Sequence, residues 1–161
     1  MVIIVMGISG AGKTATGSAL AHAVGWTFLE GDNYHPPGNI EKMRHGQSLN
    51  DADRAPWLER LRILIAEQLE QDKDTILACS ALQHEYRQLL QVNADHVRFI
   101  FLKGDFDLIH RRLKKRHGHF MTAGLLASQF EALEPPRDAF TLNIAEPVVS
   151  LVAKIRQQFD I

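Results

Sequence analysis

The apolar run Val2–Met6 leads directly into Gly7-Ile8-Ser9-Gly10-Ala11-Gly12-Lys13-Thr14. The run is rich in β-branched residues and has no alternation of polar and apolar positions, which predicts a strand buried on both faces of a sheet. From Lys13 to Ala23, apolar residues recur at helical spacing. The octapeptide therefore satisfies the pattern G-x-x-x-x-G-K-[ST] between a predicted strand and a predicted helix, which is the context that a phosphate-binding loop requires.

The glycines of this loop allow the backbone to turn its N–H groups inward around the β- and γ-phosphates of a nucleotide. The helix that follows directs its N-terminal dipole at the same anion. The predicted cofactor-binding residues are Gly7, Ile8, Ser9, Gly10, Ala11, Gly12, Lys13 and Thr14. Lys13 is also predicted to be catalytic as a mobile positive charge, and the Thr14 hydroxyl is predicted to ligate Mg²⁺. The alternative is a glycine-rich turn that binds nothing.

Beyond the loop, short apolar runs alternate with helical patterns to the end of the chain. Further strands are predicted at residues 26–29, 75–79, 97–102 and 141–144. Residues 31–56 are rich in turn formers, with at most one short helix around Asn39–Arg44, and a long amphipathic helix is expected to begin near Pro56. Such alternation predicts an α/β fold with a parallel sheet covered by helices on both faces. Ligands of these sheets bind beyond the carboxyl ends of the strands.

Composition limits the classes of protein that remain. The chain has 161 residues, 45% of them hydrophobic, and a formal net charge of -1. These values predict one domain over residues 1–161 and disfavour a basic nucleic-acid-binding surface. The N-terminal run is far shorter than the roughly 20 residues that span a bilayer, so no membrane partner is expected. A lone cysteine, Cys79, is expected to be a buried strand residue without chemistry, and it fits a cytoplasmic location.

A nucleotide-binding loop of this kind occurs in GTPase-like switches and in small-molecule kinases. The base-reading N-K-x-D and T-K-x-D patterns and the D-x-x-G pattern of switches do not occur in the sequence. Asp32 directly follows the second predicted strand, where it could accept the proton of an attacking hydroxyl or organise Mg²⁺; the alternative is a turn or capping residue. Arg112 and Arg116 share one helix face, so Arg112 is a candidate nucleotide contact and Arg116 a catalytic arginine; the alternative is a solvated basic helix end.

The chain resembles the gluconokinases over nearly its whole length. The similarity is carried by Gly31-Asp32-Asn33-Tyr34-His35-Pro36, Asp53-Arg54, Pro56-Trp57-Leu58, Cys79-Ser80-Ala81-Leu82, Tyr86-Arg87 and Ser128-Gln129-Phe130. It implies phosphorylation of D-gluconate on its 6-hydroxyl by ATP with Mg²⁺, a homodimer, and a three-layer P-loop kinase fold with a five-stranded parallel sheet and a small lid. Departures are Ser48 for Pro, Gln83 for Lys and Thr14-Ala15 for Ser-Thr, and the third strand has no aspartate at its end for the metal.

The resemblance implies an acceptor-binding segment, residues 31–58, and a lid is expected at residues 117–124. Gluconate carries one carboxylate and five hydroxyl groups, so its site should combine cations with neutral or acidic hydrogen-bonding groups. Predicted carboxylate partners are Arg54 and Arg87, and predicted hydroxyl partners are His35, Asn39 and Asp53, with Ser80 and Asp32 also facing the substrate. For Arg87 the alternative is a surface helix residue, and for Asp53 and Ser80 a helix cap.

Trp57 is expected to be a core or hinge residue rather than a platform for the sugar. The remaining alternatives are a related kinase acting on shikimate, a nucleotide or another sugar acid, and a non-catalytic nucleotide-binding module.

Overall fold

Within residues 1–115 and 123–161, which the computed structural model describes, five strands form one parallel sheet in the order β2-β3-β1-β4-β5. The strands are β1 (Val2–Met6), β2 (Thr27–Glu30), β3 (Thr75–Ala78), β4 (Val97–Lys103) and β5 (Phe140–Asn143). The helices are α1 (Lys13–Val24), the 3₁₀ helix η1 (Gly31–Tyr34), α2 (Pro37–Arg44), α3 (Asp51–Glu70), α4 (His84–Leu90), α5 (Phe106–Lys114), α6 (Ala123–Ala132) and α7 (Val148–Phe159). The predicted α/β class and the five-stranded parallel sheet are confirmed.

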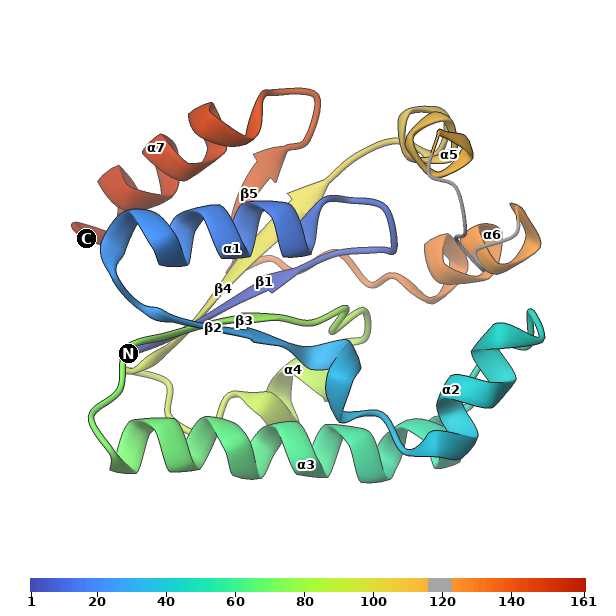
Figure 1. Ribbon diagram of the computed structural model, residues 1–161, viewed down its shortest axis with the longest axis horizontal. Coiled ribbons are helices and arrows are strands. Elements are labelled where there is room, and N and C mark those ends of the chain that lie inside the picture. Colours follow the sequence, from blue (N-terminus) through green and yellow to red (C-terminus); the bar gives the residue numbers. More distant parts are fainter. Residues whose placement is uncertain (116–122) are drawn as a thin grey trace.

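The sheet is the middle one of three layers. Helices α1 and α7 lie over one face, and α3 and α4 lie over the other (Figure 1). The side chains of β1 alternate between the two cores: Ile3 and Val5 pack on the α1 side, whereas Val2, Ile4 and Met6 pack on the α3 side. All five are fully buried, which explains why the run is apolar without alternation.

Helices α2, α5 and α6 lie beyond the carboxyl ends of the strands, on the right of Figure 1. A parallel sheet leaves its ligand site at this edge, so these helices are placed to wall that site. None of the helices in the described ranges has both the length and the hydropathy of a membrane-spanning segment.

Some predicted elements differ from the observed ones. The 3₁₀ turn η1 was not predicted, a helix containing Arg87 was given only as an alternative, and α3 begins at Asp51 rather than near Pro56. The early start results from a capping box: the Asn50 side chain accepts from the Asp53 N–H at 2.8 Å, and the Asp53 carboxylate accepts from the Asn50 N–H at 3.0 Å. Pro56 therefore lies inside the helix, where it removes the hydrogen bond to the carbonyl of Ala52 and its ring crowds that carbonyl.

Candidate active site

The predicted phosphate-binding loop turns into α1 at Gly12. Gly12 has φ 96°, a left-handed conformation that favours glycine, and it occupies the N-cap position of α1 without any side-chain cap. The first N–H groups of α1 are therefore not used by a capping side chain and remain available to an anion. This is the arrangement that the sequence pattern predicts for a phosphate cradle.

The two polar side chains after Gly12 contact groups of the protein itself. The Lys13 ammonium donates to the carbonyl oxygen of Ile8 at 3.2 Å, which folds this side chain back over its own loop. The Thr14 hydroxyl donates to a carboxylate oxygen of Glu30 at 2.6 Å. Glu30 ends β2, two residues before Asp32, so two carboxylates stand at the strand edge beside the loop.

One cavity of about 420 Å³ lies on the α7 side of the loop. It is lined by Gly10, Ala11 and Gly12 of the loop, by Arg112, and by apolar residues of the β5–α7 region such as Ile144 and Leu151. The Arg112 guanidinium donates to the carbonyl oxygen of Ile144 at 2.5 Å, which fixes it at the wall of this cavity. A mainly apolar chamber beside the phosphate loop suits the base and ribose of a nucleotide.

A second cavity, of about 370 Å³, lies on the opposite side of the same loop. Its lining comes from the loop itself, from η1, α2 and α3 of the acceptor-binding segment, from the 80–86 region and from α6. Of the predicted site residues it brings together Ser9, Lys13, Asp32, His35, Arg54 and Ser80. We name this space the acceptor cavity.

Asp32 is placed by a close approach between β2 and β3. A Cβ atom on Gly31 would lie 2.5 Å from the carbonyl oxygen of Ala78, so only glycine allows this contact. The charges gathered at this edge act on the buried thiol of Cys79. Its pKa is raised to about 12, mainly by burial; the charges of Asp32 and Glu30 also raise it, whereas a backbone hydrogen bond at Ala81 and the charge of Lys13 lower it. A thiol with this pKa is protonated near neutral pH, which agrees with the expectation that Cys79 has no chemistry.

His35 is half-buried and stacked on Trp57, with ring centroids 4.3 Å apart and an interplanar angle of 15°. Trp57 is 1% exposed, and its indole N–H donates to the carbonyl oxygen of Gly31 at 2.8 Å. Burial lowers the pKa of His35, Asp32 raises it and Arg54 lowers it, with a net downward shift. The expected core role of Trp57 is consistent with this placement, and its further effect is to hold the His35 ring.

Arg54 enters the acceptor cavity from α3 and is supported by two other side chains. Its guanidinium donates to the Tyr86 hydroxyl at 3.3 Å and lies 3.5 Å from a carboxylate oxygen of Asp51. The Tyr86 hydroxyl in turn donates to Asp51 at 2.5 Å. Burial and the Asp51 contact raise the pKa of Tyr86, so the phenol remains a donor. No pattern in the sequence predicts these roles of Tyr86 and Asp51.

The structure does not bring Arg87 to the acceptor cavity. Arg87 is 7% exposed, and its guanidinium donates to the carbonyl oxygens of Ala81 at 3.0 Å and Leu82 at 2.9 Å. Ala81 has φ 43°, a left-handed conformation that is costly for alanine. Arg87 therefore holds a strained turn next to Ser80. Its burial rules out the surface alternative, and its contact with the substrate carboxylate stays a prediction.

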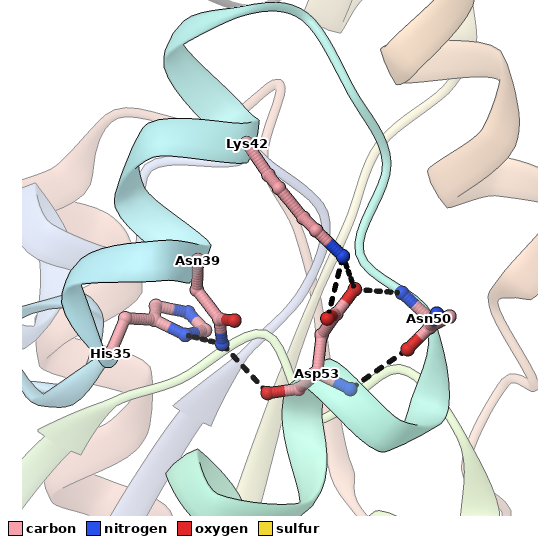
Figure 2. A network of polar contacts seen from close by, with 5 residues as sticks. All are labelled: His35, Asn39, Lys42, Asn50 and Asp53. Carbon is pink, nitrogen blue, oxygen red and sulfur yellow. Dashed lines mark hydrogen bonds and ion pairs between the residues drawn. The ribbon is translucent and has the colours of Figure 1, made fainter.

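Asp53 and Asn39, the other expected hydroxyl partners, are not among the residues that line the acceptor cavity. The Asp53 carboxylate accepts from the Lys42 ammonium at 2.7 and 2.9 Å as well as from Asn50 (Figure 2). Hydrogen bonds to Lys42 and Asn50 lower the pKa of Asp53. Asn39 is buried and bonded within the segment. Both residues build the segment rather than line its cavity.

Helix α6 closes the acceptor cavity from the other side. The side-chain oxygen of Gln129 accepts from the backbone N–H of Ser9 at 2.7 Å, and the hydroxyls of Ser48 and Ser128 are 3.4 Å apart. Of the expected lid, residues 117–122 lie outside the described residues, as does Arg116, and residues 123–124 form the start of α6.

No cluster of three or more His, Cys, Asp or Glu side chains that could hold a metal occurs in the described part of the chain. Thr14 and Glu30 nevertheless supply adjacent hard oxygen atoms next to the phosphate loop, which is the ligand chemistry of Mg²⁺ with bound phosphates and waters. Glu30 was missed because a carboxylate ending a strand carries no motif; its position one residue from Gly31-Asp32 was the available signal.

Comparison with known proteins places this site in a family. The model of the shikimate kinase family matches residues 9–149. The thermoresistant gluconokinase of Escherichia coli K12 is 43% identical over 156 residues, covering 94% of this chain and 89% of the relative. The chain belongs to the gluconokinase family. The resemblance inferred from the 31–58 segment is therefore confirmed.

Solved structures support membership of the gluconokinase family. A gluconokinase from Sinorhizobium meliloti 1021 is 38% identical with a TM-score of 0.83, over 98% of this chain and 94% of that chain. An unliganded sugar kinase from Janibacter sp. HTCC2649 is 37% identical with a TM-score of 0.92, over 99% and 94%. The expected P-loop kinase architecture is thus shown for this gluconokinase-family chain.

Proposed function

We propose that the protein transfers the γ-phosphoryl group of ATP to the 6-hydroxyl of D-gluconate, giving 6-phospho-D-gluconate and ADP. The observation that carries the proposal is the position of the phosphate loop between two cavities. Gly10, Ala11 and Gly12 line one cavity, whereas Ser9 and Lys13 line the other. A triphosphate held by the loop would therefore end where an acceptor alcohol can approach it.

The acceptor cavity has the groups that a sugar acid needs. Arg54 is a planar cation suited to a carboxylate, and its support by Tyr86 and Asp51 restricts its freedom. His35 and Ser80 offer neutral hydrogen bonds to hydroxyl groups. Asp32, the predicted catalytic carboxylate, lines the same cavity as Lys13.

In the mechanism that we propose, Asp32 accepts the proton of the 6-hydroxyl as its oxygen attacks the γ-phosphorus, and the bond to the ADP oxygen breaks. Lys13, now turned toward the loop carbonyl of Ile8, moves onto the phosphates and neutralises the charge that develops there. Arg116 stays a predicted second cation. Bound Mg²⁺ would neutralise phosphate charge, and Thr14 with Glu30 would hold it directly or through water.

Three substitutions test these roles. Lys13→Met should abolish most turnover.

Asp32→Asn should reduce the rate by roughly 10²–10⁴ if Asp32 is the base, and rescue by added Mg²⁺ would instead assign it to the metal. Arg116→Ala should lower kcat more than it raises the KM for ATP, and an unchanged kcat would remove Arg116 from the mechanism.

The substrate is tested by ADP release with a panel of acceptors. D-Gluconate should give kcat/KM far above that with shikimate, nucleoside monophosphates or other sugar acids. Preference for shikimate or a nucleotide would establish a different small kinase, and nucleotide binding without acceptor-stimulated turnover would establish a binding module. The panel also includes GTP in place of ATP, because the base preference follows from the 420 Å³ cavity and not from the loop.

A homodimer, which the family resemblance implies, and a cytoplasmic location, which the lone cysteine fits, are part of the same proposal. Light scattering of the purified protein across a concentration series tests the dimer. A monomer mass at all concentrations would contradict it.

A further inference from the structure

Asn39 is a buried polar side chain that connects two parts of the acceptor-binding segment, the start of α3 and the His35 ring. It lies on α2, is 5% exposed, and does not line the acceptor cavity. Its amide nitrogen Nδ2 is 2.7 Å from the carbonyl oxygen of Asp53 and 3.3 Å from Nδ1 of His35 (Figure 2). One amide group thus joins the first turn of α3 to a ring that lines the cavity.

The chemistry of these contacts fixes which atom donates. A backbone carbonyl oxygen only accepts, so the Asn39 atom that faces Asp53 must be the NH₂ group. That group has two hydrogen atoms, one for the Asp53 oxygen and one for His35. Nδ1 of His35 therefore accepts, and in the neutral imidazole the proton is on Nε2.

Other contacts keep the ring neutral and in place. Trp57 stacks on it, and the charged groups that face it are Asp32 from η1 and Arg54 from α3, with burial as the dominant influence on its pKa. A doubly protonated ring would set an Nδ1–H against the NH₂ group of Asn39. Nε2 has no hydrogen-bond partner among the residues that the structure describes, so its proton is available to a ligand of the acceptor cavity.

We propose that Asn39 is a positioning residue for the phosphotransfer: it holds His35 in the tautomer whose Nε2–H donates a hydrogen bond to an oxygen of the sugar acid. The inference rests on the proposed function for the identity of that ligand. Asp32 and His35 then make different hydrogen bonds in the cavity: the Asp32 carboxylate accepts one, and Nε2–H of His35 donates one. The pair would recognise an alcohol proton and a neighbouring oxygen lone pair separately.

Asn39→Asp is the sharpest variant, since it keeps the size of the side chain and replaces the donor by an acceptor. A carboxylate would draw the ring proton to Nδ1 and leave Nε2 bare in the neutral form. We expect the KM for gluconate to rise about tenfold at about pH 8, with the KM for ATP unchanged, because one hydrogen bond is lost. At about pH 6 the ring becomes doubly protonated beside the new carboxylate, Nε2–H returns, and the KM defect should shrink.

Lys42→Ala is the matched control for a merely structural role. Lys42 also joins α2 to α3, through its ion pair with Asp53, but it does not touch His35. If Asn39 acted only as a clamp between these helices, Lys42→Ala would reproduce its effects. We expect instead a small change in KM that does not depend on pH.

Nitrogen NMR of the histidine-labelled enzyme gives the decisive readout, with His35 assigned from a His35→Gln spectrum. The wild type should show a protonated Nε2 and a bare Nδ1, and Asn39→Asp should reverse them. A wild-type proton on Nδ1, or a KM defect of Asn39→Asp that is the same at both pH values, would overturn the proposal.

The wild-type spectrum decides the tautomer even if Asn39→Asp does not fold or gluconate is not the acceptor. In that case His35→Gln, whose amide can donate from near the Nε2 position, should bind the acceptor better than His35→Leu, and equal loss in both would contradict the role of the donor.

Discussion

The Thr14 hydroxyl is hydrogen-bonded to the Glu30 carboxylate at 2.6 Å, which connects the first turn of α1 to the end of β2. The link supplies the carboxylate that the end of β3 lacks, where Ala78-Cys79-Ser80 has no acidic side chain. It also orients a hydroxyl that the loop pattern assigns to Mg²⁺. Glu30 would thus raise the affinity for Mg²⁺ by orienting the Thr14 hydroxyl.

Glu30→Gln should weaken the binding of Mg²⁺ by roughly 10–100-fold, because a carboxylate that is hydrogen-bonded to a metal ligand orients that ligand. The measurement is the Mg²⁺ concentration for half-maximal activity, with Glu30→Asp as a control that keeps the charge. Superimposable Mg²⁺ titrations of wild type and Glu30→Gln would exclude the role.

Tyr86→Phe should raise the KM for gluconate about fivefold with little change in kcat, because the lost hydroxyl contributes a net hydrogen bond of about 1 kcal/mol to the position of Arg54. The Asp51 and Arg54 contacts to this hydroxyl are the reason. Steady-state kinetics in both substrates provide the test. A rise in the KM for ATP instead would place Arg54 on the nucleotide.

Arg87→Met should lower the free energy of unfolding by about 2–3 kcal/mol, because two buried carbonyl groups lose their donor. Urea denaturation measures this loss, with Arg111→Met on the exposed side of α5 as the surface control. Unchanged stability together with a large KM defect for gluconate would restore the direct contact that the sequence suggested.

The pKa of His35 is lowered from 6.5 in the folded protein, so the unfolded chain binds more protons near that pH. The contribution of His35 to stability is therefore present above pH 6.5 and is lost as the pH falls toward the folded pKa. Denaturation curves across this window should show a shallower pH dependence in His35→Gln than in the wild type. Parallel slopes would show that His35 is not held neutral by the fold.

Local patterns predicted the elements whose residues are buried on both sides, such as β1, and the loop whose glycines turn it toward phosphate. The phosphate-loop pattern, the strand ends and the family resemblance also predicted Lys13, Asp32, His35, Arg54 and Ser80 as site residues, and the fold brings all five to one cavity. The direction of Arg87 depended on the left-handed turn at Ala81, which no spacing in the sequence reveals.

Specific side-chain contacts, local as well as distant, account for the other differences. Pro56 suggested a helix start, but the reciprocal bonds of Asn50 and Asp53 nucleate α3 five residues earlier. Asp53 was predicted to bind hydroxyl groups, but its carboxylate is paired with Lys42, eleven residues before it. The pairing of Thr14 with Glu30 likewise requires the strand order of the folded sheet.

The central claim is that an alcohol in the acceptor cavity meets the end of a triphosphate at Lys13 and Asp32. Phosphorus and carbon NMR of the product formed from ATP and D-gluconate tests it most directly. The account predicts a single phosphate ester coupled to the terminal CH₂ of the sugar acid, absent with Lys13→Met. Inorganic phosphate as the only new phosphorus signal, or an ester at another carbon, would contradict it.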